Sequence, residues 1–157
     1  MLQHLELSGP CDLLCCMSSL FLSEPDLIER VEIAVMQQTA ADEFTQIKAL
    51  WPSFERLVGL PGRKMYARVD ERANTYTVCT PIRDDDHPDE LGLQSGTLRG
   101  GWYLRGRLAG EPPELYGRIG PAMSELKAAA RLDETRELVE FYRRHDQIEL
   151  WVPVTRS

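Results

Sequence analysis

The sequence has few of the features that mark a nucleic-acid-binding protein. Only three of its 18 basic residues are lysines, and no basic run is longer than the pair Arg143–Arg144. The 25 acidic residues bring the formal net charge to −7 at pH 7. Because proteins that follow a phosphate backbone usually carry a basic stripe, these counts argue against direct nucleic acid binding.

Long hydrophobic runs and targeting signals are also missing. The longest apolar stretch, roughly residues 11–22, contains an aspartate and two serines. It is shorter than the ~20 residues that a membrane-spanning helix needs. No Lys or Arg precedes it, so a signal peptide would lack its positive start. We therefore expect a cytoplasmic protein that does not bind membranes.

The residues that usually build metal centres and nucleophilic sites are scarce and badly spaced. The three histidines have no Ser or Cys partner in a nucleophile motif, and the run Asp84–His87 lacks the spacing and glycine of a calcium loop. We expect this run to be a solvated linker, and we expect neither a metal nor a cofactor. Reduced, apolar thiols are expected at the four cysteines, which are Cys11, Cys15, Cys16 and Cys79.

Two segments have the periodicity of amphipathic helices. Residues 44–58 place apolar side chains three and four positions apart, and Gly59 followed by Pro61 is typical of a helix end. A second apolar stripe runs through residues 115–126. Both segments contain the pattern Pro-x-apolar-x-x-Leu, beginning at Pro52 and at Pro121, which suggests a shared geometry.

Strand patterns surround the two helices in the same order. Residues 76–82 and 148–154 both alternate and then reach Pro followed by a β-branched residue. Further strands are expected at 31–37, 64–70, 101–108 and 139–144. The order predicts an α+β fold of two βαββ repeats, related by pseudo-two-fold symmetry, in one antiparallel sheet with both helices on one face. The halves would span about 29–83 and 96–155, separated by a ligand groove, with residues 1–28 as a strand-like extension ahead of a domain at 29–157.

Three segments of the sequence resemble those of a known protein family. The segments Tyr116–Pro121, Glu140–Arg144 and Ile148–Val154 are similar to the GyrI-like small-molecule-binding domain, which is also the effector-binding domain of AraC- and MerR-type regulators. The resemblance covers about 26–154, and the final acidic-apolar-aromatic-apolar-Pro motif is its most specific part. It implies a groove that binds lipophilic, often cationic, aromatic compounds. Because about thirty preceding residues could not hold a helix-turn-helix of the usual size, we expect a stand-alone form that senses or sequesters drugs.

The resemblance also implies that a glutamate and an aromatic residue of the last strand meet the ligand. Glu149 and Trp151 occupy those positions and, two apart on a strand, share one face. A carboxylate beside an indole attracts a delocalised cation. The alternative is an edge glutamate over a tryptophan with no ligand. Glu140 and Tyr142 repeat the pattern on the neighbouring strand and would reach the same groove, unless Glu140 pairs with surface arginines.

Aromatic residues elsewhere are candidate walls of the groove, although aromatics at such spacing also fill ordinary cores. Phenols are favoured because they provide a polar handle in an apolar pocket. The candidates are Trp51, Phe54, Tyr66, Trp102 and Tyr103.

Two other functions are consistent with the sequence. One is a hydrolase of cyclopropanoid or similar reactive natural products, in which Glu149 or Glu140 positions or deprotonates a water molecule. The other is a protein-interaction module of the gyrase-inhibitor type.

Both faces of the strand at residues 148–152 carry apolar groups. The helices and the ligand would cover one face, so the other needs cover from residues 11–22 or from a second subunit. We therefore expect either a homodimer or a monomer capped by its own N-terminal arm.

Overall fold

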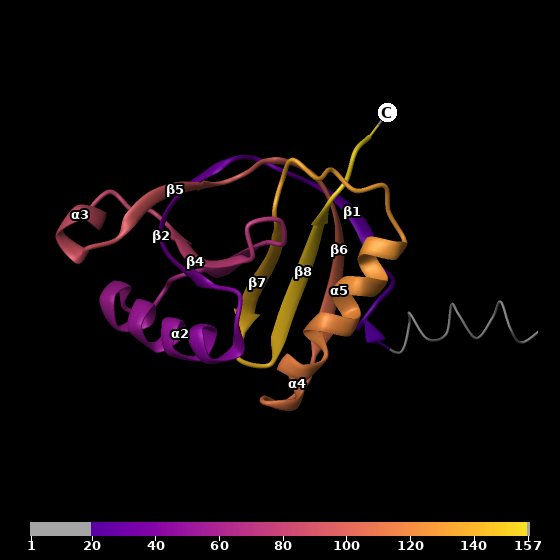
Figure 1. Ribbon diagram of the computed structural model, residues 1–157, viewed down its shortest axis with the longest axis horizontal. Coiled ribbons are helices and arrows are strands. Elements are labelled where there is room, and N and C mark those ends of the chain that lie inside the picture. Colours follow the sequence, from indigo (N-terminus) through magenta and orange to yellow (C-terminus); the bar gives the residue numbers. More distant parts are fainter. Residues whose placement is uncertain (1–19, 157) are drawn as a thin grey trace, which may run out of the picture.

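An eight-stranded antiparallel sheet runs through the part of the chain that the computed structural model describes, residues 20–156. Its strands are hydrogen-bonded in the order β1-β6-β8-β7-β3-β4-β2-β5 (Figure 1). The strands are β1 (Asp26–Arg30), β2 (Ile33–Ala41), β3 (Met65–Asp70), β4 (Thr75–Pro81), β5 (Gln94–Leu98), β6 (Gly101–Ala109), β7 (Leu138–Arg144) and β8 (Gln147–Pro153).

Two longer helices pack against one face of this sheet, which confirms the α+β class. Helix α2 (Phe44–Val58) has the predicted bounds, and Gly59 ends it at φ 77° with its N–H donated to the carbonyl of Glu55. The second predicted helix is divided into the single turn α4 (Glu114–Gly117) and α5 (Ile119–Ala128). A further short helix, α3 (Pro88–Leu91), precedes β5. None of the described helices is long and apolar enough to cross a membrane.

The sheet has two strands that the sequence analysis did not predict. Strand β1 pairs with β6, although its residues mostly fall in the expected extension. Strand β5 pairs with β2 and lies within a glycine-rich stretch, residues 92–101. The sequence of β5 shows no alternation of apolar and polar residues, because Ser95, Gly96 and Thr97 are all small and none of them marks a buried face. The internal duplication stays a prediction, and Cys11, Cys15 and Cys16 lie outside the described residues.

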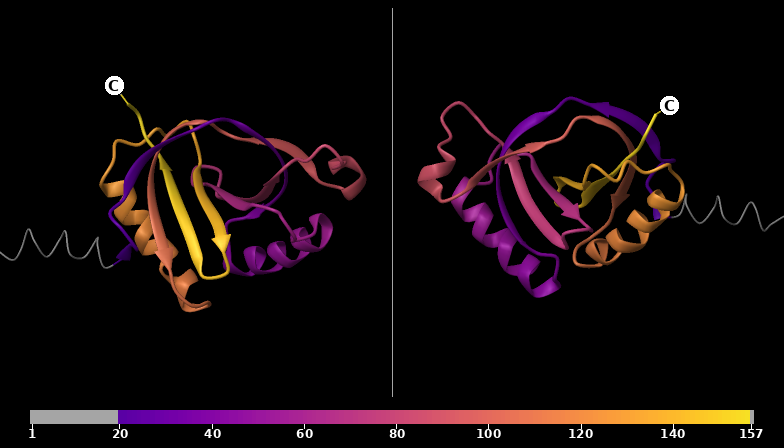
Figure 2. Two further views of the ribbon diagram at one scale, coloured as in Figure 1. Left: turned by 180° about the vertical axis from the view of Figure 1, so that it is seen from behind. Right: turned by 45° about the horizontal axis from the view of Figure 1, so that its top comes forward.

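The inner face of the sheet is covered by the curl of the sheet itself (Figure 2). A cluster of side chains, one from each strand except β1, fills the curl, and its members bury one another: Val35, Tyr66, Cys79, Leu98, Tyr103, Val139 and Trp151. The argument that this face needs an N-terminal arm or a second subunit is therefore wrong, because it requires an open sheet whose inner face is bare. A homodimer stays untested.

The links between β1 and β2 and between β5 and β6 meet where the curl closes. Each link has two residues, and Gly100 of the second lies against the first. A Cβ atom on Gly100 would lie 2.8 Å from the carbonyl oxygen of Arg30 and from the backbone nitrogen of Glu32. Only glycine fits this approach without displacement of the backbone.

The outer face carries two apolar clusters, one under each helix. Leu50, Phe54 and Val58 of α2 pack against β2, β3 and β4, whereas α5 packs with Leu108, Ile148 and Leu150 of β6 and β8. Tyr142 on β7 contacts both clusters, so it marks the boundary between the two helices.

The acidic run before α3 is anchored by a buried ion pair, contrary to the expected solvated linker. The Arg63 guanidinium donates two hydrogen bonds of 2.6 Å to the two oxygens of Asp86, and the side chains are only 7% and 8% exposed. Asp86 also accepts the backbone N–H of Arg83. The hydrogen bonds from Arg63 lower the pKa of Asp86 from 3.8 to about 2.

We predict that Asp86→Asn lowers the free energy of unfolding by about 2 kcal/mol at pH 7, because it leaves Arg63 buried beside a neutral group. A lowered carboxyl pKa stabilises the fold above its unfolded value of 3.8, and this contribution is lost as the pH falls through about 2. Urea unfolding at several pH values should therefore show wild type and variant converging in acid. The exposed neighbour gives the control Asp85→Asn, and an equal loss in both variants would contradict the prediction.

Candidate ligand-binding site

The outer face holds a buried carboxylate between the two helices. Glu140 of β7 is 6% exposed, and its Oε1 accepts hydrogen bonds from the hydroxyls of Tyr76 at 2.8 Å and Tyr142 at 2.7 Å. Within residues 20–156, Oε2 accepts no hydrogen bond, and no Lys or Arg forms an ion pair with Glu140. Ala67 of β3 lies between Glu140 and β4 in the register, and its methyl group leaves room for Tyr76 to reach across.

The surroundings of Glu140 favour its protonated form. Burial raises the pKa of Glu140 above its ordinary value of 4.5, although the hydrogen bonds from Tyr142 and Tyr76 oppose the shift. Burial also raises the pKa of both phenols, and the nearby carboxylate adds to the effect. The tyrosines thus keep their protons and donate them to Oε1.

Aromatic rings close the site above the carboxylate. The indole N–H of Trp51 donates to the hydroxyl of Tyr76 at 3.2 Å, and the Trp51 ring meets the Tyr142 ring edge-on with centroids 4.9 Å apart. The ring of Tyr116 on α4 also meets that of Tyr142, with centroids 6.5 Å apart, and Tyr116 is 48% exposed. The rings come from α2, β4, α4 and β7, so the site joins the two predicted halves.

Glu149 lies on the opposite face of the sheet, inside the curl, which corrects the expectation of one shared groove. In the β7–β8 register Glu149 pairs with Phe141, whereas Glu140 pairs with Leu150. Glu149 accepts the indole N–H of Trp151 at 3.0 Å. It also has two cationic neighbours, with guanidinium nitrogens of Arg143 and Arg105 at 3.4 Å and 3.8 Å.

The other candidate residues fall into three places. Tyr66, Tyr103 and Trp151 are almost fully buried inside the curl, and Phe54 is buried beneath α2. Trp102 lies near the start of β6 under the guanidinium of Arg156, 4.2 Å from its ring. Of the nine candidates, the structure therefore places only Glu140, Tyr142 and Trp51 around the same carboxylate.

The sequence analysis missed Tyr76 and Tyr116. Both lie in segments that it had identified, one in a predicted strand and one in a motif of the family resemblance. Their role depends on β3 pairing with both β4 and β7, and on the short turn α4. No local pattern in the sequence reports either feature.

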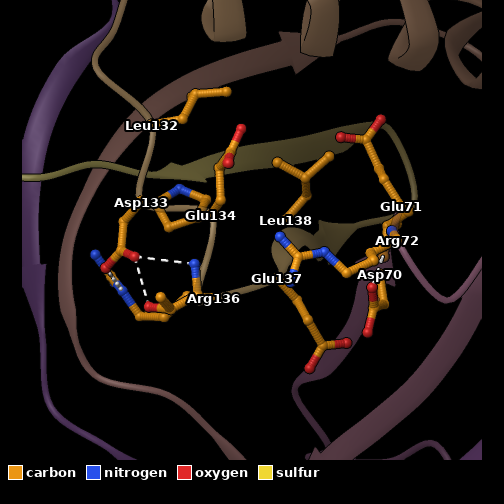
Figure 3. A pocket seen from close by; sticks show the side chains of 12 residues that line it. Asp70, Glu71, Arg72, Leu132, Asp133, Glu134, Arg136, Glu137 and Leu138 are labelled. Carbon is orange, nitrogen blue, oxygen red and sulfur yellow. Dashed lines mark hydrogen bonds and ion pairs between the residues drawn. The ribbon is translucent and has the colours of Figure 1, made fainter.

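One cavity lies away from Glu140. It has a volume of about 470 Å³ and is lined by the β3–β4 turn, by residues 132–138 and by Pro153 (Figure 3). Its polar groups largely bind within the loops themselves. Asp133 forms an ion pair with Arg136 at 2.9 Å, and Asp70 accepts backbone N–H groups from Arg72 and Ala73. These bonds connect residues within each of the two loops, and Glu71 pairs with Lys127 of α5 at 2.8 Å.

Comparison with known proteins is informative at the level of structure only. No protein-family profile and no curated protein matches the chain. An integron cassette protein from the mobile metagenome of Vibrio cholerae shares 17% identity with a TM-score of 0.67, over 83% of this chain and 95% of that one. The protein SAV2435, solved bound to tetraphenylphosphonium, shares 15% identity with a TM-score of 0.57, over 84% of this chain and 94% of that one.

The EcmrR C-terminal domain shares 16% identity with a TM-score of 0.60, over 85% of this chain and 98% of that domain. The chain has the GyrI-like fold. The resemblance inferred from the sequence is thereby confirmed for the architecture, while identities below a fifth leave the ligand to be argued from the site itself.

We predict that Glu140→Gln stabilises the protein at neutral pH. A carboxyl whose pKa is raised by folding stabilises the fold only while it is protonated, so that contribution falls as the pH rises above the unfolded value of 4.5. The amide does not titrate and still accepts from both phenols. The melting temperature of the variant, measured from pH 4 to 8, should exceed that of wild type increasingly as the pH rises.

The exposed Glu134→Gln is the matched control, because it removes the same charge and should show no such pH-dependent gain. If Glu140→Gln is less stable than wild type at pH 8, the ionised carboxylate stabilises the fold and the prediction is wrong.

Proposed function

We propose that the protein binds lipophilic aromatic cations at Glu140, between α2 and α5. The observation that carries the proposal is a buried carboxylate that is surrounded by aromatic rings and has no cationic partner in the described chain. Such a group is costly as an anion in the free protein, and a ligand that brings positive charge relieves that cost. The likeness to SAV2435, whose structure holds tetraphenylphosphonium, supports the same class of ligand.

The chemistry of the site favours a delocalised cation over a compact one. A large cation with spread charge loses less hydration on burial than an ammonium group does, because hydration weakens as ionic radius grows. The faces of Trp51, Tyr142 and Tyr116 add attraction through their ring quadrupoles. The oxygen Oε2 of Glu140 is the expected point of closest approach of the charge.

Entry of a ligand requires the rings to separate. The contacts that close the site are edge contacts between Trp51, Tyr142 and Tyr116. A flat aromatic ligand can replace them with contacts of its own, so little packing is lost. Tyr116 is half-exposed on a single helical turn, and it is the ring that we expect to move.

Hydrolysis of a reactive natural product is a second proposal, supported by the same free oxygen. Oε2 of Glu140 would accept a proton from water as the water oxygen bonds to a ring carbon. The strained ring C–C bond breaks, and Tyr142 or Tyr76 protonates the atom that receives its electron pair. The raised pKa of Glu140 brings the carboxyl closer to the range useful for proton transfer. Product formation from a cyclopropane-bearing alkylating compound, absent in Glu140→Gln, would establish it.

We predict that tetraphenylphosphonium binds saturably and quenches tryptophan emission, and that Glu140→Gln weakens its binding about tenfold or more, since a buried charge contact is worth a few kcal/mol. Titration calorimetry gives the affinity, and Trp51→Phe assigns the quenching to this site. Neutral triphenylphosphine oxide should bind wild type and Glu140→Gln with similar affinity.

The matched control is Glu149→Gln, which removes a buried carboxylate from the other face of the sheet. It should leave tetraphenylphosphonium binding unchanged. Loss of binding in Glu149→Gln with retention in Glu140→Gln would overturn the assignment and return the site to the interior of the curl.

We further predict that the affinity for the cation rises with pH. The cation binds the ionised carboxylate, and the pKa of Glu140 is raised in the free protein, so binding releases a proton wherever that carboxyl is protonated. Calorimetry in buffers of different ionisation enthalpy should detect the release at mildly acidic pH. An affinity that is flat from pH 4.5 to 8 would contradict this mechanism.

A further inference from the structure

A second cavity lies at one end of the sheet, beside the β7–β8 hairpin, and has a different chemistry. Its volume is about 240 Å³. It lies where the last residues of β6 run beside the turn that joins β7 to β8. It is lined by Leu22, Arg107, Leu108, Arg143, Arg144, Gln147, Ile148 and Glu149. Neither Glu140 nor the rings around it line this cavity, so it is separate from the cation site.

The lining is rich in positive charge, although the whole chain is acidic. Three arginines line the cavity against one carboxylate, and Arg105 adds a fourth guanidinium next to Glu149. Glu149 is shared between Arg143 at 3.4 Å and Arg105 at 3.8 Å. Arg105 is also held by Asp26, with a guanidinium nitrogen 2.7 Å from a carboxylate oxygen. Two carboxylates therefore serve four guanidinium groups, and positive charge remains in excess.

Arg107 carries a buried guanidinium nitrogen that no group within residues 20–156 pairs with. Its Nε is buried without a hydrogen-bond partner, and within residues 20–156 its side chain forms no hydrogen bond or ion pair. Arg63 and Arg68 also have an unpartnered Nε, but their other nitrogens bind Asp86 and Gln37. A buried donor without an acceptor is rare in folded proteins and is commonly explained by a ligand or water.

We propose that this cavity binds a compact oxyanion, a carboxylate or phosphate group, through Arg107 and Arg143. A guanidinium offers its donors in a planar fork that fits two oxygens of such a group. The excess positive charge favours an anion, and the volume suits a small molecule rather than a polymer. Glu149 opposes the anion by charge, and at the same time it positions Arg143.

The experiment is calorimetric titration of the full chain with inorganic phosphate, acetate and butyrate, at constant ionic strength set with chloride and in a cationic buffer. We expect saturable binding of at least one of them, weakened about tenfold in Arg107→Gln and in Arg143→Gln. Glu149→Gln should bind the anion more tightly, because it removes the opposing charge. The matched control is Arg131→Gln, which removes an equal charge from an exposed position and should behave as wild type.

The relative affinities for the three anions also indicate which class of compound supplies the oxyanion. Preference for phosphate indicates a phosphorylated compound, and preference for butyrate over acetate indicates an organic acid whose chain contacts Leu22. No saturation with any of the three anions would overturn the proposal, as would equal affinities in wild type and Arg107→Gln or weaker binding in Glu149→Gln. Tetraphenylphosphonium titrated in parallel separates this result from the fate of the cation site.

Discussion

The alternation of side chains along β7 and β8 determines what each face of the sheet can do. Neighbouring residues of a strand point to opposite faces, so two glutamates that look equivalent in the sequence occupy unrelated surroundings. Glu140 faces the helices and their aromatic side chains, whereas Glu149 faces the arginines inside the curl. The register fixes this division, and a shift of one residue would exchange the two environments.

The two carboxylates also differ in how their burial is compensated. Hydrogen bonds from neutral phenols hold Glu140, and they leave its charge without a counterion. Glu149 has hydrogen bonding and charge compensation together, from Trp151 and from two arginines. An acid that is already compensated has little to gain from a cationic ligand. The residue favoured by the sequence motif is therefore the less suitable of the two by its electrostatics.

Much of the architecture could be predicted from local patterns. The bounds of α2 follow from its apolar spacing and from Gly59, and the alternation of β8 is plain in the sequence. Strand β5 escaped prediction because its small residues do not show which face is buried. The site was harder: Glu140, Tyr142 and Trp51 were named, but Tyr76 joins them only through pairings between strands more than sixty residues apart. Such pairings leave no mark at either position alone.

The crossing of the two short links at Gly100 has a mechanical consequence. Strands β1 and β2 are consecutive in the chain but lie near opposite ends of the strand order, and the same holds for β5 and β6. Each two-residue link therefore acts as a tether between distant parts of the sheet and holds it in its curl. The curl cannot flatten unless β1 and β5 both detach from their neighbours, because either link alone still joins the two ends of the strand order. Helices α2 and α4 on the outer face are not held by such links. We therefore expect the movement that the proposed ligand requires to come from these helices and not from the curled sheet.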